Sequence, residues 1–255
     1  MKVWIVKALS IVVCLSTISQ ADITSLNSAI NKAGKQRMLS QRIMKDYSMV
    51  GMNMKYNDPQ KELKSSVELF STTLDELLKF SKDKDEASYK AFQELKSLWD
   101  PLKTELLATP NKEKAVEIYK SVEKLLATAH KATNSIASTS KEKTGEIINI
   151  SGRQRMLSQR LASLYMLKVW GVGMDDADLQ TSMKEFIAAQ KKLEEFPKNS
   201  DEIKSGLAQV KKDFMFFKVL GASKSKKYIP SLIARSSNKI TAKMNDITKL
   251  YEEIK

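Results

Sequence analysis

Apolar residues recur along the chain at the three- and four-residue spacing of amphipathic helices, and no stretch shows the convincing two-residue alternation of a strand. Clusters of turn-forming residues, such as Asn57-Asp58-Pro59 and Thr109-Pro110-Asn111, interrupt this pattern. The pattern predicts four helices in each half of the chain. The four helices of the first half run over about residues 23–54, 60–81, 86–108 and 112–138. In the second half, the first helix runs over about residues 143–172, the second ends near residue 196, and the last two run over about residues 201–220 and 229–254.

This plan predicts an all-α fold of two tandem antiparallel four-helix bundles, with residues 22–140 in the first and residues 141–255 in the second. The placement of the bundles stays open, because neither Pro nor Gly interrupts the chain at their junction before Gly145. A continuous helix there would stack them end to end, whereas a turn would lay them side by side with their first helices parallel. Aromatic clusters are expected in the two cores: Phe92 and Trp99 in one half, Phe214, Phe216 and Phe217 in the other.

One ten-residue phrase occurs twice, at residues 33–42 and at residues 151–160. The glycine and the seven residues Gln-Arg-Met-Leu-Ser-Gln-Arg are identical in the two copies, while the rest of the two halves is only loosely alike. A duplication explains why there are two copies. It does not explain why this part alone stayed the same, so we expect the phrase to do more than maintain the fold.

On a helix, the phrase places a polar centre within an otherwise apolar stripe, with an arginine where a bundle helix normally carries leucine. A glycine one turn earlier allows a neighbouring helix or a ligand to approach closely. The second arginine of each phrase, Arg42 or Arg160, points in another direction. The stripe consists of Leu26, Ile30, Gly34, Arg37, Gln41 and Met44 in the first copy, and of Ile148, Gly152, Arg155 and Gln159 in the second.

An arginine in a buried stripe requires a partner, because an unpaired buried charge is costly. The arginine either makes an internal ion pair or caps a helix of this chain, or its partner is a small anion. No acidic residue recurs at matching places in the two first helices, since Asp46 corresponds to Leu164, although acidic residues of other helices remain candidates. A guanidinium group presents paired planar donors, which suit a flat oxyanion such as nitrate or a carboxylate.

The first 21 residues have the pattern of a secretory signal peptide. Lys2 and Lys7 precede a short apolar run, and small residues lead to a cleavage site after Ala21. Cleavage would remove Cys14, the single cysteine, and leave no segment of about 20 apolar residues. We therefore expect a periplasmic protein without disulfides.

The net charge of +13 does not by itself indicate nucleic acid, because lysines alternate with acidic residues as on solvated helix faces. No nucleophile motif or phosphate-binding loop indicates an enzyme, and no cofactor is expected. The single histidine, His130, has no metal-ligand spacing and is interpreted as an ordinary helix residue. The acidic residues Asp175, Asp176 and Asp178 are interpreted as a helix start rather than a cation site.

The repeated phrase resembles a known sequence motif. Ile30-Asn31-x-Ala33-Gly34-x-x-Arg37-Met38-x-Ser40-x-Arg42-Ile43 is similar to the P-box of NarX/NarQ-type nitrate and nitrite sensors, and its second copy is equally similar. The Gln-Arg-Met-Leu-Ser-Gln-Arg form is typical of PilJ-type sensor domains. The resemblance implies an all-helical periplasmic bundle in which nitrate binds between the first helices of two domains. The ligand-binding residues it implies are Gly34, Arg37, Gln41, Gly152, Arg155 and Gln159.

Two functions follow as hypotheses. In the first, a periplasmic protein captures nitrate or nitrite at a site formed within one chain or across a homodimer, and passes its state to a membrane sensor, since no kinase or methylated segment is visible. In the second, the stripes are packing surfaces for a protein partner or a second copy, and no small ligand exists.

Overall fold

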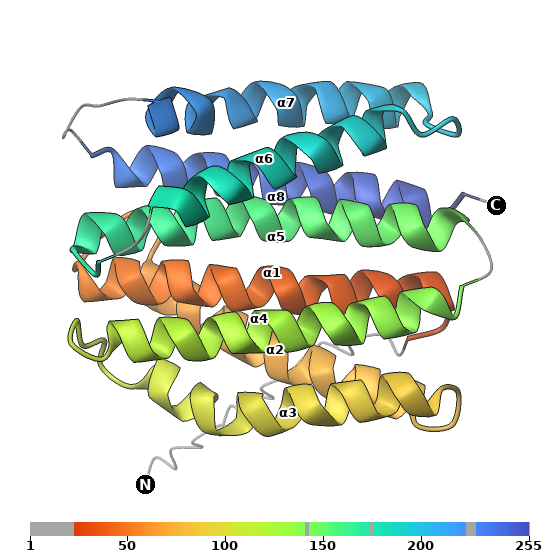
Figure 1. Ribbon diagram of the computed structural model, residues 1–255, viewed down its shortest axis with the longest axis horizontal. Helices are drawn as coiled ribbons and strands as arrows, with labels where there is room; N and C mark the ends of the chain where they lie inside the picture. The colour runs from red at the N-terminus through yellow and green to blue at the C-terminus, as the bar shows by residue number, and fades with distance from the viewer. Residues whose placement is uncertain (1–22, 141–142, 174–175, 223–227, 255) are drawn as a thin grey trace, which may run out of the picture.

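A computed structural model describes residues 23–140, 143–173, 176–222 and 228–254. These residues form helices and contain no strand, which confirms the predicted all-α fold (Figure 1). The helix ends lie within a few residues of those predicted. The helices are α1 (Leu26–Gly51), α2 (Pro59–Ser81), α3 (Glu86–Leu107), α4 (Ala115–Ser138), α5 (Lys143–Trp170), α6 (Asp176–Glu194), α7 (Asp201–Ala222) and α8 (Pro230–Glu252).

Local sequence signals set several helix starts. The side chain of Ser25 accepts a hydrogen bond from the backbone N–H of Ser28 and caps α1, and Asp85 caps α3 in the same way. Asp58 caps α2 from a left-handed backbone conformation, and Pro59 occupies the first turn, where its missing N–H costs no hydrogen bond. The expected cap at Asp175 lies outside the described residues.

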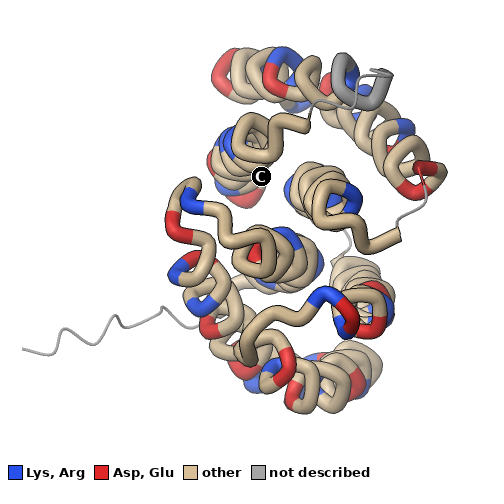
Figure 2. The backbone as a smooth tube through the Cα atoms, turned by 90° about the vertical axis from the view of Figure 1, so that its left-hand side faces the viewer, with Lys and Arg blue, Asp and Glu red and all other residues tan. Residues whose placement is uncertain are grey.

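The helices form two antiparallel four-helix bundles, α1–α4 and α5–α8, that lie side by side (Figures 1 and 2). The central helices α1 and α5 pack against each other and run parallel. Because α4 ends at Ser138 and α5 starts at Lys143 in the opposite direction, the chain turns here, and the end-to-end alternative is wrong. The domain boundary between residues 140 and 141 remains a prediction, and the predicted signal peptide, residues 1–21, lies outside the described residues.

Each bundle has an aromatic pair in its core. Phe70 and Trp99 join α2 to α3 with ring centroids 4.0 Å apart, and Phe186 and Phe214 join α6 to α7 at the same distance. The prediction that Phe216 belongs to this core is wrong, because its side chain is 46% exposed. A helix turns about 100° per residue, so Phe214 faces the core while the residue two positions later faces outward.

Several polar contacts join the bundles beside the central helix pair, among them those of Arg160 and Lys45. Arg160 of α5 donates from Nη1 to Glu123 Oε1 of α4 at 2.6 Å, so this arginine does point away from the stripe, toward a carboxylate. Lys45 of α1 donates to Asn238 Oδ1 of α8 at 2.9 Å. Each contact links a central helix of one bundle to the last helix of the other.

The adjacent residues Phe216 and Phe217 test this packing. Phe217 is 4% exposed, so Phe217→Ala should lower the free energy of unfolding by about 3–5 kcal/mol through the cavity it leaves. Phe216→Ala is the matched control and should change it by less than about 0.5 kcal/mol, as is usual at an exposed site. Urea unfolding followed by far-ultraviolet circular dichroism measures both values. Equal losses for the two variants would contradict the described orientation of α7.

Candidate functional site

The two copies of the repeated phrase lie face to face where α1 and α5 pack. A Cβ atom added to Gly34 would lie 3.5 Å from the Cα atom of Gly152, so the backbones approach closely because both residues lack a side chain. The same added atom would lie 3.2 Å from Nη2 of Arg37 and 3.3 Å from Nη2 of Arg155. The two glycines therefore make the space into which both guanidinium groups reach.

The two arginines make reciprocal hydrogen bonds across the helix pair. Arg37 of α1 donates from Nη2 to the backbone carbonyl of Asn149 on α5 at 3.0 Å. Arg155 of α5 donates from Nη2 to the carbonyl of Asn31 on α1 at 3.3 Å. Both carbonyls belong to the same position of the repeat, so the two halves are related by an approximate twofold arrangement. The predicted residues Gly34, Arg37, Gly152 and Arg155 thus come together within one chain.

Both guanidinium groups are buried without a carboxylate partner. Arg37 is 0% and Arg155 1% exposed, and no described acidic side chain lies within ion-pair distance of either. Burial above all, and then the charges of Arg155 and Arg153, lower the pKa of Arg37 to about 9. Burial lowers the pKa of Arg155 to about 10, against the raising effect of Glu252. Both groups therefore stay charged at neutral pH, although their surroundings oppose the charge.

Buried polar atoms without a hydrogen-bond partner gather at these helices. Within the part of the chain that the structure describes, the Nε atoms of both arginines have no acceptor. One side-chain oxygen at each of three further positions of the repeat also lacks a partner, in both copies. These residues are Asn31, Gln36 and Gln41 in the first half and Asn149, Gln154 and Gln159 in the second. Such atoms are rare in folded proteins, so a matched set in both copies requires an explanation.

The Nη1 atoms of the two arginines have unlike neighbours. Arg37 Nη1 lies 3.2 Å from Nδ1 of His130 on α4, and Arg155 Nη1 donates to Asn245 Oδ1 on α8 at 2.9 Å. Sequence reasoning missed both neighbours and treated His130 as an ordinary helix residue. No signal in the sequence could identify them, because the face of α4 or α8 that meets an arginine is set by the packing of distant helices.

The glutamines of the stripe lie one turn further along. Gln41 donates to Glu123 Oε1 on α4 at 3.1 Å, and Gln159 donates to Thr241 Oγ1 on α8 at 2.7 Å. Their amide groups are buried but already bonded to neighbouring helices, and each leaves its oxygen without a partner. The structure places them next to the arginines without bringing them to the glycine contact.

Other residues of the phrase hold the arginines in position. Ser40 donates to the carbonyl of Arg37 and Ser158 to that of Arg155, both at 2.8 Å. Gln36 donates to the carbonyl of Phe70 on α2 at 3.1 Å, which fixes the rotation of α1 against its own bundle. Much of the identity between the two copies therefore serves to orient one arginine.

The family comparison agrees with this architecture. The PilJ family, described as the N-terminal part of type IV pili methyl-accepting chemotaxis transducers, matches residues 20–125 and 136–214. The chain belongs to the PilJ family. No curated protein and no solved structure gives a significant match. PilJ is a family of sensory rather than catalytic domains.

Two further observations concern the described residues of this PilJ protein. None of the described helices has the length and apolar character needed to cross a membrane. The described residues also contain no cluster of histidine, cysteine and acidic side chains suited to a metal ion.

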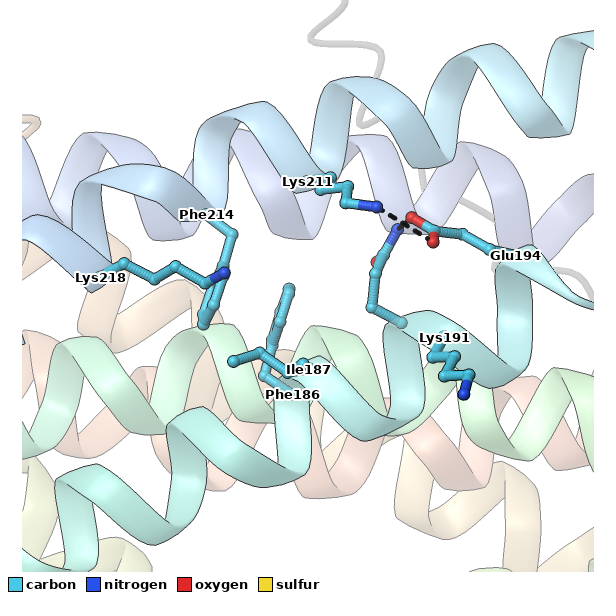
Figure 3. Close-up of a pocket in the computed structure, with 8 residues that line it drawn as sticks. Phe186, Ile187, Lys191, Glu194, Lys211, Phe214 and Lys218 are labelled. Atoms are coloured by element: carbon cyan, nitrogen blue, oxygen red, sulfur yellow. Dashed lines mark hydrogen bonds and ion pairs between the residues drawn. The ribbon is translucent and has the colours of Figure 1, made fainter.

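An open groove lies apart from the arginines, between α6 and α7 (Figure 3). It has a volume of about 290 Å³ and an apolar floor that includes the stacked rings of Phe186 and Phe214. Lys191, Lys211 and Lys218 lie at its edge, and Lys211 pairs with Glu194 at 3.3 Å. This groove belongs to one bundle, whereas the arginine site of the PilJ protein lies between the two.

Because Arg37 has no carboxylate partner, replacing this arginine should stabilise the protein rather than destabilise it. In a buffer without small oxyanions, Arg37→Met should raise the free energy of unfolding by about 1–3 kcal/mol, because it replaces a buried charge with apolar packing. Arg160→Met is the matched control. It leaves Glu123 without its partner and should lower the free energy of unfolding by about 3 kcal/mol. Urea unfolding measures both variants. If Arg37→Met lowered the free energy of unfolding as much as the control does, Arg37 would mainly stabilise the fold.

Proposed function

We propose that this protein is a periplasmic sensory protein that binds nitrate or nitrite between α1 and α5. The main support is the pair of buried guanidinium groups, Arg37 and Arg155, which lack a carboxylate and whose Nε–H groups lack an acceptor among the described residues. A planar monoanion between them would supply the missing negative charge and accept those hydrogen bonds. It would also reduce the repulsion between two cations in a low-dielectric interior.

One surrounding amide fits the same ligand. The amides of Asn31 and Gln41 are fixed, because their nitrogens donate to the carboxylates of Glu252 and Glu123. The unpartnered atom of Asn149 is placed as an oxygen, but this amide faces that of Asn134, so the hydrogen-bond network also allows the opposite orientation. An amide turned over presents an N–H group that can donate to an anion. The glycine contact leaves backbone, rather than apolar side chains, next to Arg37 and Arg155. The site therefore offers guanidinium donors, while the neighbouring carboxylates of Glu123 and Glu252 are bonded to the amides of Gln41 and Asn31.

The sensory role rests on family membership and on the position of the site. An anion held by Arg37 and Arg155 contacts both central helices, so its binding energy acts directly on their spacing. We propose that the two bundles transmit this change to a membrane sensor of the chemotaxis-transducer class. Export to the periplasm rests on the signal-peptide pattern of residues 1–21 and on the periplasmic location of PilJ domains in chemoreceptors.

The alternative of a purely structural interaction module receives less support. It requires the stripes to be packing surfaces for another molecule. Gly34 and Arg37 are instead buried against Gly152 and Arg155 of the same chain, so that surface is already covered.

Nitrate should stabilise the native protein. At fixed ionic strength and a hundredfold excess over the dissociation constant, binding to the native state alone raises the free energy of unfolding by about 2.7 kcal/mol. Chloride and sulfate should have much smaller effects, and nitrite should resemble nitrate. Thermal and urea unfolding measure the effect, and isothermal titration calorimetry measures the dissociation constant.

Arginine variants separate this effect from general salt effects. Arg37→Met and Arg155→Met should each abolish the stabilisation by nitrate. Arg235→Met is the control, because Arg235 is exposed on α8 and should leave the response unchanged. Nitrate stabilisation that persists in both buried-site variants, or no stabilisation of the unmodified protein, would refute the proposed site.

A further inference from the structure

The two halves of the arginine site differ in one ionisable residue. Arg37 meets the ring of His130, while the corresponding guanidinium of Arg155 meets the neutral amide of Asn245. His130 is half-buried, so protons from solvent can reach its ring, whereas Arg37 is fully buried. Of these two neighbours of the Nη1 atoms, His130 is the one that can change charge near neutral pH, and it lies on the Arg37 side.

The geometry defines the proton position on the ring. A guanidinium group can only donate, so Nδ1 of His130 accepts from Arg37 Nη1 and the ring is neutral, with its proton on Nε2. Nε2 lies 3.0 Å from the Asn134 amide, which must then present its oxygen to that proton. The other end of this amide faces the Asn149 side chain at 3.1 Å.

The proton position on His130 also determines the orientation of the Asn149 amide. Once the nitrogen of Asn134 faces Asn149, the Asn149 oxygen must turn outward to accept from it. The Asn149 atom that is buried without a partner then becomes an N–H donor. The neutral ring of His130 thereby sets the orientation of the Asn149 amide, in the residue whose backbone carbonyl accepts from Arg37, so that its buried atom is a donor, as an anion requires.

The charges around His130 come from three neighbouring helices. Arg37 lies on α1, Arg153 on α5 and Glu185 on α6, and Glu185 pairs with Arg153 at 3.2 Å. Burial, then the Arg37 and Arg153 charges, lower the pKa of His130, and Glu185 raises it. In the free protein, burial and the charge of Arg37, one of the two cations that would hold the anion, therefore oppose protonation of the ring.

We propose that His130 couples anion binding at Arg37 and Arg155 to the uptake of one proton. The inference rests on the proposed function and adds a regulatory residue to it. An anion that accepts the Nε–H of Arg37 draws the guanidinium toward itself and releases Nδ1 of His130 from Nη1, and its negative charge offsets that of the guanidinium. One proton from solvent then binds Nδ1, and no other bond forms or breaks.

The direction of the pH dependence follows from linkage. The anion removes part of the repulsion that lowers the pKa of His130, so the pKa of this ring is higher in the complex than in the free protein. The affinity for the anion therefore rises as the pH falls through the pKa that His130 has in the complex. It becomes constant below the pKa that His130 has in the free protein. Asn245 does not titrate, and the titratable groups on the Arg155 side are Lys35 and Glu252, so the comparison with His130→Asn separates their protons from that of His130.

The experiment is calorimetric titration with nitrate between about pH 5.5 and 7, in two buffers of different ionisation enthalpy. The upper limit avoids Lys35, which lies near Arg155 and whose pKa is lowered to about 8 by burial and that charge. The unmodified protein should take up a proton in this range and bind nitrate several-fold more tightly at the acid end. His130→Asn keeps an acceptor for Arg37, as Asn245 does for Arg155, and should bind nitrate without proton uptake.

The outcomes separate the two proposals. Nitrate binding with no proton uptake, or equal uptake in His130→Asn, overturns the role of His130 and leaves the anion site standing. Failure of nitrate to bind at any pH overturns the proposed function and this inference together. Because His130 is the single histidine of the chain, the nuclear magnetic resonance of its ring protons gives a second, independent measure of its pKa. A pKa that nitrate leaves unchanged while nitrate binds also overturns the coupling.

Discussion

The close approach of α1 and α5 at Gly34 and Gly152 is the constraint on which the rest of the structure depends. A Cβ atom at either position would lie 3.0–3.3 Å from the guanidinium nitrogens, so these groups or the helices would have to shift. The contact lets Arg37 and Arg155 each reach a carbonyl of the opposite helix. It also holds two like charges close together in a buried region. The backbone interaction that joins the halves thus creates an electrostatic cost at the same place.

The two halves share the site but not its surroundings. Glu123 on α4 serves both Gln41 and Arg160, whereas Thr241 and Asn238 on α8 offer Gln159 neutral partners. Among the described residues, the ion pair between Arg160 and Glu123 therefore lies on the α4 side of the central helices, whereas on the α8 side Lys45 meets the neutral amide of Asn238. The same side carries His130 beside Arg37. Two equivalent arginines consequently have unequal electrostatic environments, which an assembly of two identical chains related by exact twofold symmetry could not provide.

The sequence predicts local structure here more completely than helix packing. Each helix is encoded in its own apolar spacing and end signals, such as Pro59 and Asp85, so the predicted and observed ends agree closely. The stripe containing Gly34 and Arg37 was also readable, because its periodicity is local. The side-by-side placement and the His130 contact were not, since they depend on which helix faces meet. Phe216 shows the same limit within one helix, where membership in an aromatic cluster did not determine which way its ring faces.

The repeated phrase can now be divided by role. Gln36 and Ser40 orient the helix and its arginine through bonds that the fold needs in any state. Arg37 contributes a buried charge that the fold alone does not satisfy. A duplication under selection for stability only would be free to replace that arginine with an apolar residue in one copy. Both copies keep the arginine, and the two arginines face each other at the glycine contact. This is expected when a ligand of opposite charge binds between them and neutralises their buried charges.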